Sequence, residues 1–307
     1  MLLRRPVHTY SIVARDPATG ELGIAVQSHW FCVGTAVVWA EPGSGVMAVQ
    51  ADAEPSYGTQ GMRLLAGGAA AEDTLAQLLR EGVRPESHQL ALIDRAGRVA
   101  VHTGRDCIPV AGHQSGPSYA AQANMMLSPG TWQAIGQAFE AAKGPLADRL
   151  LAALNAGEAQ GGDLRGKQSA AMVVIRPTAT GNRRLDRPVD LRVDDNPDPL
   201  AELGRLLGLR NATDLANDGF EHLWRGDAGA AAAAFEAASR RAPEQLEFAF
   251  WFAWSLLAGG RDVAAFDAFV SVFKAEPQHA VLLERLARME DRQLDDRLVR
   301  LMASARK

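Results

Sequence analysis

A repeat spaced by 34 residues in the last third of the sequence constrains the fold more than any other feature. A small residue, a phenylalanine and a proline occur in this order twice, as Ala231, Phe235 and Pro243 and then as Ala265, Phe269 and Pro277. A small residue lets two antiparallel helices approach closely, a phenylalanine fills the space between them, and a proline ends the second helix. The spacing therefore predicts two stacked pairs of helices.

A period of this length is typical of tetratricopeptide repeats. Gly219 and Ala238 fill two further small positions of the first repeat. We expect residues 209–307 to form an all-α domain of two tetratricopeptide-like repeats, with a capping helix over residues 278–289. Such repeats either present a surface to a protein partner or pack against the first domain or a second subunit.

An aromatic run in this region bears on the oligomeric state. It consists of Phe248, Phe250, Trp251, Phe252 and Trp254. A helix this apolar is not expected to be solvated, so it must be buried somewhere. We predict a homodimer through this region.

The rest of the chain predicts a separate α+β domain over residues 1–208, because a polar, proline-marked segment at residues 194–199 precedes the helical part. Short apolar runs bounded by turn residues predict strands over residues 10–14, 22–26, 46–50, 89–94, 98–103, 169–176 and 189–193. Helical spacing predicts helices over residues 58–82 with a break at 67–68, over 129–142 with Ser128 as N-cap, and over 146–159. This order favours helices packed on mainly antiparallel sheets over an alternating βαβ fold.

Composition excludes several classes of protein. Lys plus Arg number 32 and Asp plus Glu 36, giving a net charge of −4, and no basic run is present. A weakly acidic chain of this kind is a poor binder of nucleic acids and anionic membranes. No apolar run reaches the ~20 residues needed to span a bilayer, and the basic N-terminal residues are not followed by the apolar segment of a secretory signal. We therefore expect a cytoplasmic protein.

The cysteines and histidines of the sequence do not indicate a metal site. The only cysteines, Cys32 and Cys107, are far apart, which excludes a disulfide framework and a cysteine-rich zinc site, and we expect both to be small buried hydrophobes. None of the seven histidines pairs with another at metal-ligand spacing. The sequence predicts neither a metal nor an organic cofactor.

Thr9 is the residue with the clearest chemical potential, because it immediately precedes the first predicted strand. If Thr9 became the first residue, its α-amine could act as general base for its own hydroxyl, since an α-amine has a pKa of about 7.7–8.0. This is the threonine–amine variant of nucleophilic catalysis. The alternative is that Thr9 is only a β-branched strand residue.

Polar residues also gather at the predicted strand ends. They are Ser28 after the second strand, Gln50, Asp52, Ser56 and Tyr57 after the third, Gln122 and Asn124 in a small apolar stretch, and Asp163, Arg165, Gln168 and Ser169 in a glycine loop. Amides and hydroxyls at a strand end can form an oxyanion hole, and an Asp–Arg pair can orient a carboxylate. The alternative for each residue is local turn chemistry.

Several of these segments resemble one bacterial family, called domain of unknown function 1028. The similar segments are residues 9–17 and 20–26, Pro55–Gly58, Gln122–Met126, residues 162–171, and residues 191–195 followed by Pro197. The resemblance covers about residues 8 to 208. That family is grouped with the N-terminal nucleophile (Ntn) hydrolases, so the resemblance implies a four-layer αββα sandwich.

The resemblance also implies an activity. Thr9 would be the nucleophile, with Ser28, Asn124, Asp163 and Arg165 beside it, and the substrate would be a small amide or a peptide. Ser56, Tyr57, Gln122, Gln168 and Ser169, which lie in the similar segments, would line the pocket, and Gln50 and Asp52 at the end of the third predicted strand are further substrate-binding candidates. The resemblance assigns no individual roles. The implied reaction is amide hydrolysis.

The sequence departs from that family in the segment before Thr9. Many relatives place the threonine directly after the initiator methionine, whereas residues 1–8 precede it here, and His8 replaces the glycine typical of self-processing precursors. Proteolysis or autocleavage removes the segment, or the true start lies elsewhere, or the site is inactive. Two hypotheses therefore stand: an Ntn-type amidohydrolase, or a non-catalytic binding or scaffold protein on the same fold.

Overall fold

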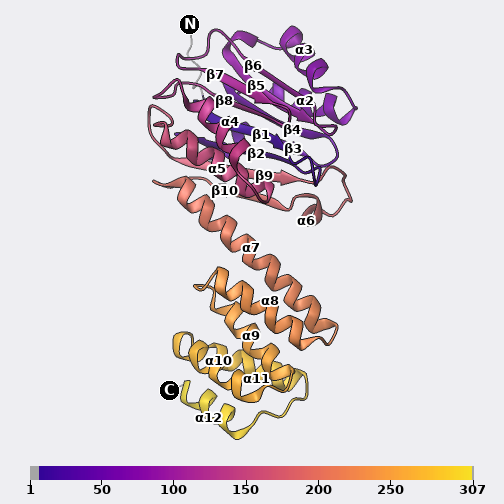
Figure 1. Cartoon of the computed structure of the whole chain (residues 1–307), viewed down its shortest axis with the longest axis vertical. Coiled ribbons are helices and arrows are strands. Elements are labelled where there is room, and N and C mark those ends of the chain that lie inside the picture. The colour runs from indigo at the N-terminus through magenta and orange to yellow at the C-terminus, as the bar shows by residue number, and fades with distance from the viewer. Residues whose placement is uncertain (1–6, 306–307) are drawn as a thin grey trace. The chain divides into compact units, whose positions relative to one another are not determined.

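The computed structural model describes residues 7–305. The chain divides between Leu206 and Leu207 into two compact units, one of sheets and helices and one entirely helical (Figure 1). The mixed α/β part followed by an all-helical part is as the sequence predicts. The boundary falls within a long helix, α7 (Pro199–Trp224), which begins at the proline that closes the polar segment.

The first unit contains two antiparallel sheets. The larger has the strand order β10-β9-β2-β1-β8-β7 and the smaller β3-β4-β5-β6. The larger comprises β1 (Thr9–Arg15), β2 (Leu22–Ser28), β7 (Gly112–Gly116), β8 (Tyr119–Ala123), β9 (Ser169–Ile175) and β10 (Val189–Val193). The smaller comprises β3 (Val38–Glu41), β4 (Gly45–Ala51), β5 (His88–Asp94) and β6 (Val99–Thr103). Strand β1 lies inside the larger sheet, between β2 and β8.

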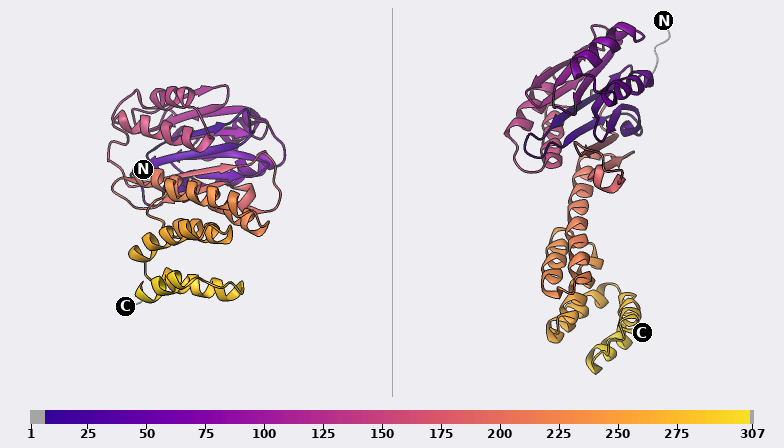
Figure 2. Two further views of the ribbon diagram at one scale, coloured as in Figure 1. Left: turned by 60° about the horizontal axis from the view of Figure 1, so that its bottom comes forward. Right: turned by 90° about the vertical axis from the view of Figure 1, so that its right-hand side faces the viewer.

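Helices cover the outer faces of the two sheets, as Figures 1 and 2 show. Helices α4 (Thr131–Ala141) and α5 (Leu146–Ala159) pack on the larger sheet, and α2 (Pro55–Ala66) and α3 (Ala71–Glu81) on the smaller. The short helices are α1 (Val33–Val37), η1 (Pro85–Ser87) and α6 (Arg183–Asp186).

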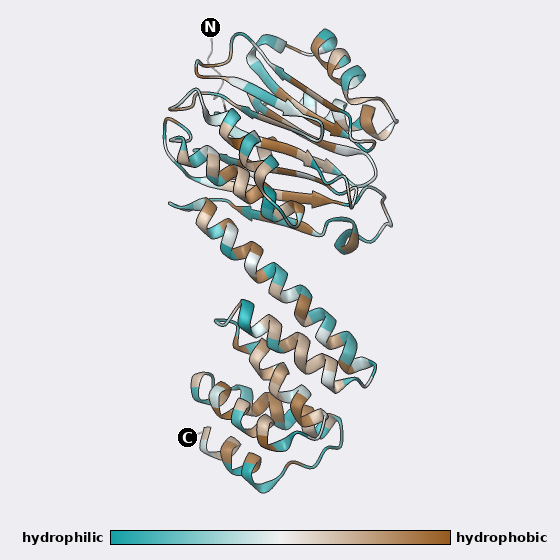
Figure 3. Cartoon of the chain, viewed as in Figure 1, coloured by the Kyte–Doolittle hydropathy of each residue, from teal (hydrophilic) through white to brown (hydrophobic). Residues whose placement is uncertain are grey.

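Side chains alternate along each strand, so each strand contributes to two apolar clusters, one between the sheets and one beneath the helices. On β1, Val13 points toward the smaller sheet and belongs to the apolar cluster between the sheets, whereas Tyr10 and Ile12 point the other way. On β4, Val46 and Ala48 face between the sheets, while Met47 packs in the cluster beneath α2 and α3. Figure 3 shows hydrophobic residues concentrated along these strands.

The structure corrects several sequence predictions of detail. Strands β3, β7 and β8 were not predicted, and the helix expected from residue 129 begins at Thr131. Gly130 is its N-cap, and Ser128 instead accepts the Gly130 N–H at 3.2 Å. Cys107 is buried as expected, and burial raises its pKa to about 11. The prediction for Cys32 is wrong, because this residue is partly exposed at the N-cap of α1.

The helical unit continues with five helices after α7. They are α8 (Ala228–Arg241), α9 (Leu246–Ala258), α10 (Asp262–Ala275), α11 (His279–Met289) and α12 (Asp296–Ala305). The repeated residues occupy equivalent places: Phe235 and Phe269 are both fully buried, and α8 and α10 each end two residues before a proline. A Cβ on Gly219 would come within 2.7 Å of the Phe235 ring, so only glycine fits this contact.

The aromatic helix α9 is covered within its own chain. It packs between α8 and α10, and Phe250 and Trp254 are 0% and 2% exposed. Burial of this helix therefore requires no second subunit, because α8 and α10 supply the apolar surface. The homodimer stays a prediction.

We expect Phe269→Ala to lower the free energy of unfolding of the helical unit by about 3–5 kcal/mol, because it leaves a cavity in a close-packed core. The Phe269 ring packs against those of Phe250 and Phe273 at 5.6 and 5.4 Å. Urea unfolding followed by circular dichroism measures the change. Val263→Ala is the control, since this side chain on α10 is 66% exposed, and equal effects of both substitutions would contradict the packing described.

Candidate functional site

At one end of the space between the sheets, polar side chains replace the apolar core. The alternation that directs Val13 inward also directs Thr9 and Ser11 of β1 inward, and the same holds on the neighbouring strands. The inward polar residues are Thr9, Ser11, Ser28, Gln50, Gln89, Gln122 and Asn124, and all are 0% exposed. Buried polar groups are costly unless each is hydrogen-bonded, so their partners decide what the cluster can do.

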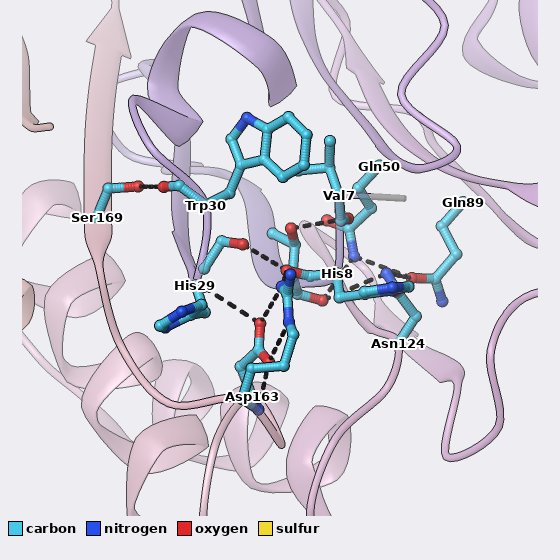
Figure 4. Close-up of polar contacts among 12 residues, drawn as sticks. Val7, His8, His29, Trp30, Gln50, Gln89, Asn124, Asp163 and Ser169 are labelled. Atoms are coloured by element: carbon cyan, nitrogen blue, oxygen red, sulfur yellow. Dashed lines mark hydrogen bonds and ion pairs between the residues drawn. The ribbon is translucent and has the colours of Figure 1, made fainter. Parts of the chain in front are cut away.

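Three amide side chains, of Gln50 on β4, Gln89 on β5 and Asn124 just after β8, form a connected network (Figure 4). Gln89 Oε1 accepts hydrogen bonds from Gln50 Nε2 at 2.9 Å and from Asn124 Nδ2 at 2.8 Å. Ser11 Oγ donates to Gln50 Oε1 at 2.6 Å, and Gln122 Nε2 reaches Ser11 Oγ at 3.5 Å. The network fixes the side chains that surround the start of β1.

The peptide bond between His8 and Thr9 lies in the middle of this cluster. The His8 carbonyl oxygen accepts a short hydrogen bond from Ser28 Oγ and another from Arg165 Nη2 at 3.0 Å. The Thr9 carbonyl oxygen accepts from the Asn124 N–H at 3.1 Å and from Gln50 Nε2 at 3.0 Å. The Thr9 hydroxyl donates to the Val7 carbonyl at 3.0 Å. Both carbonyls flanking the Thr9 nitrogen are thus held by donors.

Asp163 holds the Arg165 guanidinium in place. Its carboxylate, fully buried, accepts from Arg165 Nη2 at 2.7 Å and Nε at 3.0 Å and from the His29 N–H at 3.2 Å. A two-point contact of this kind fixes the plane of the guanidinium. Arg165 Nη2 is therefore directed at the His8 carbonyl rather than free in solvent.

His8 itself is buried and uncharged. Its Nδ1 lies 3.0 Å from Asn124 Oδ1, and the residue is 4% exposed. Burial lowers the pKa of His8 below its ordinary value, and the nearby Arg165 charge lowers it further; together they outweigh the contacts with Asn124 and the Asp163 carboxylate, which raise it. The imidazole is therefore neutral near pH 7.

The structure brings together Thr9, Ser28, Gln50, Asn124, Asp163 and Arg165 among the residues predicted from the sequence, with Gln122 linked through Ser11. It places the others elsewhere. Ser169 binds the Trp30 carbonyl and the Val33 N–H at the start of α1, and the partly exposed Gln168 amide donates to Asp195 Oδ1 at 3.1 Å.

Asp52, Ser56 and Tyr57 also lie outside the cluster. Asp52 pairs with Arg84, Tyr57 donates to the Val83 carbonyl at 3.2 Å, and Ser56 is exposed on α2. The cause is local: Ala51 ends β4 with a positive φ of 70°, which turns the chain away from the strand direction.

Sequence reasoning missed three residues of the cluster, His8, Ser11 and Gln89. The signal for Gln89 was the strand 88–94, in which position 89 falls on the same face as Ala91 and Ile93. A polar residue on an otherwise apolar inward face indicates a buried network. His8 carried no comparable signal, because its place depends on contacts with Ser28, Asn124 and Arg165, which are distant in the sequence.

The model of a family of unknown function, DUF1028, matches residues 9–203. The chain belongs to this family. The DUF1028 match begins at Thr9. A crystal structure of a DUF1028 protein from Silicibacter pomeroyi has 32% sequence identity and a TM-score of 0.58, covering 65% of this chain and 88% of that one. No curated protein matches the chain.

Among residues 7–305, no three histidine, cysteine, aspartate or glutamate side chains gather in a way that could hold a metal ion. In the same range, no helix combines the length and the hydropathy required to cross a membrane.

We expect the melting temperature to fall between pH 7.5 and pH 5.5. Burial lowers the pKa of both His8 and His88, which are 4% and 1% exposed, below 6.5 in the folded chain. The unfolded chain then binds protons more readily, so the stability present above pH 6.5 is lost as the pH falls toward the folded-state pKa values. Thermal unfolding at the two pH values measures the loss. His88→Gln should show a smaller fall, and an unchanged melting temperature of the original chain would contradict the assignment.

Proposed function

We propose that this DUF1028 protein is an Ntn-type amidohydrolase in which Thr9, exposed by removal of residues 1–8, attacks a small amide or a peptide. The proposed fold is the four-layer αββα sandwich of that superfamily, and two facing sheets with helices on both outer faces support it. The family match, which starts at Thr9, agrees with Thr9 as the first residue.

One observation carries the proposal. Ser28 Oγ and Arg165 Nη2 both donate to the carbonyl oxygen that directly precedes Thr9. Donors placed at this point stabilise the negative charge that forms when a nucleophile attacks that carbonyl carbon. If the segment before Thr9 only continued strand β1, its carbonyl would be satisfied by neutral backbone partners and would need no charged donor.

The chemistry then follows from the residues present. The Thr9 hydroxyl attacks the amide carbon of the substrate, the α-amine of Thr9 accepts the hydroxyl proton, and Ser28 and Arg165 hold the oxyanion. The C–N bond breaks as the leaving amine takes the proton, which leaves an ester on Thr9 Oγ1. Water hydrolyses this ester, releasing the carboxylate and restoring the hydroxyl.

The same groups can expose Thr9. Attack by the Thr9 hydroxyl on the His8 carbonyl carbon forms an ester, breaks the His8–Thr9 C–N bond and leaves a proton on the new amine. Water then cleaves the ester and releases residues 1–8 as an acid. The Val7 carbonyl, which holds the Thr9 hydroxyl at 3.0 Å, leaves with the segment, and the hydroxyl becomes free to donate to the amine.

Backbone strain supports a functional role for this region. Ala51 and Met125 have positive φ angles of 70° and 55°, and each directly follows a residue of the cluster. Non-glycine residues rarely adopt this conformation, and such strain concentrates at functional sites.

The second candidate is a non-catalytic binding or scaffold protein on the same fold. One observation favours it: Val7 and His8 fill the site, being 3% and 4% exposed. A Thr9→Ala variant with an unimpaired cellular role would support this candidate.

For the helical unit we propose two tetratricopeptide-like repeats, formed by α7 with α8 and by α9 with α10, with α11 as a cap. The close contact of Gly219 with Phe235 and the equivalent burial of Phe235 and Phe269 support this assignment. Its role would be packing or the binding of a protein partner.

Periodate oxidation tests the proposed enzyme. Periodate cleaves a free amine beside a hydroxyl, a pair that a polypeptide presents only at an N-terminal serine or threonine. We expect the chain to hydrolyse members of a panel of N-acyl aminomethylcoumarin amides, and we expect brief periodate treatment to abolish the hydrolysis. Hydrolysis that survives complete oxidation, or no hydrolysis of any amide, would contradict the proposal.

A further inference from the structure

The two residues before Thr9 occupy the cluster, and Val7 forms an isolated β-bridge there. The Val7 N–H donates to the Ala51 carbonyl at 2.6 Å, and the Ala51 N–H donates to the Val7 carbonyl at 3.1 Å, an antiparallel bridge at the end of β4. Pairing of main chain with a strand end is a common mode of peptide recognition, in which side-chain pockets add specificity. Val7 and His8 are therefore held as a peptide ligand would be.

The orientation of the amide network is fixed by backbone carbonyls, which can only accept hydrogen bonds. Gln89 donates through Nε2 to the Ala123 and Gly112 carbonyls at 2.9 and 3.2 Å. Its Oε1 must therefore be the atom that faces the other amides, and it accepts from Asn124 Nδ2 at 2.8 Å. Asn124 Oδ1 is left as an acceptor directed at His8.

This orientation determines what the side chain before Thr9 must provide. Asn124 Oδ1 lies 3.0 Å from His8 Nδ1, so Nδ1 must carry the hydrogen atom. Asn124 is 0% exposed, and with an apolar side chain at position 8 this oxygen would lose its partner without gaining access to bulk water. An unpaired buried acceptor is costly, so the position selects a donor.

We propose that the site exposed at Thr9 cleaves peptides and peptide amides after a residue whose side chain donates a hydrogen bond to Asn124 Oδ1, with histidine preferred, and with the preceding residue paired to the Ala51 main chain. The inference rests on the proposed function and specifies its substrate class. The covalent steps are those of the proposed function, with water as the only co-reactant. The neutral state of His8, caused by burial, agrees with a site that takes an uncharged donor.

The test compares three fluorogenic amides that differ at one residue. They are the aminomethylcoumarin amides of acetyl-Val-His, acetyl-Val-Leu and acetyl-Val-Phe, hydrolysed by the Thr9-initiated form of the chain. We expect kcat/KM for the histidine substrate to exceed the other two by about tenfold or more, because a site with a buried polar group rejects an analogue that leaves the group unpaired. N-methylation of the valine removes the N–H given to Ala51 and should lower kcat/KM about tenfold.

Two variants separate specificity from loss of activity. Asn124→Leu should reduce the ratio of histidine to leucine hydrolysis toward one, whatever its absolute rate. Ser56→Ala, an exposed substitution on α2, should leave the ratio unchanged. If all three substrates were hydrolysed at equal rates and methylation of the valine had no effect, this inference would be overturned, while the proposed amidohydrolase activity would still hold. The absence of a Thr9-initiated form, or of any amide hydrolysis, would overturn both.

Discussion

Replacing Thr9 with alanine is expected to lower kcat/KM for amide hydrolysis by about 10³-fold or more, because it removes the attacking oxygen. The same substitution should leave residues 1–8 attached in every molecule, since no hydroxyl is present to attack the His8 carbonyl. Thr9→Ser keeps the hydroxyl and the amine and should retain measurable activity. Intact mass and hydrolysis rates of the three chains measure the effect.

Stability provides the control for this comparison. Thr9→Ala loses one buried hydrogen bond, from the Thr9 hydroxyl to the Val7 carbonyl at 3.0 Å, which costs about 1 kcal/mol. The alanine variant should therefore remain folded, with a melting temperature close to that of Thr9→Ser. A folded Thr9→Ala chain with undiminished hydrolysis would show that the nucleophile lies elsewhere.

The second large effect is expected from the donors to the His8 carbonyl. Ser28→Ala should slow both release of residues 1–8 and amide hydrolysis by about 10²–10³-fold, the usual effect of removing one oxyanion donor. The loss should appear in kcat more than in KM, because the donor acts on charge that develops during reaction. Steady-state kinetics and the time course of the intact mass measure it.

Matched variants separate the loss of the oxyanion donor from a general loss of stability. Ser56→Ala makes the same chemical change on the exposed face of α2 and should alter neither rate. Arg165→Met should slow the reaction to a similar degree, but it also deprives the buried Asp163 carboxylate of its cation, so its melting temperature should fall as well. Amide cleavage at the original rate by the Ser28→Ala chain would contradict the oxyanion role of Ser28.

Much of the fold could be predicted from short-range patterns. The strands with β-branched residues, such as β2 and β9, were recognisable because apolar runs end at turn residues. Strand β7 has the sequence GHQSG, which has no strand propensity of its own. It becomes a strand because β8 offers it a pairing edge, and such tertiary effects override local propensity.

The candidate site was predictable only in part, for a physical reason. Thr9 and Ser28 mark strand ends in the sequence, and they are cross-strand partners in the structure. Gln89 joins the cluster from the smaller sheet by accepting from Asn124 Nδ2, which follows β8 of the larger sheet, and this contact depends on how the two sheets face one another. Single-strand patterns contain no information on that arrangement, so Asp52 and Tyr57, polar residues that follow the end of β4, could not be separated from the true neighbours.

The intact mass of the purified full-length chain, followed during incubation at neutral pH, tests the central claim most directly. The account predicts a species that begins at Thr9 and grows at the expense of the full-length chain, together with the released peptide ending in His8. A chain that keeps the His8–Thr9 bond indefinitely, and that hydrolyses no amide, would contradict it.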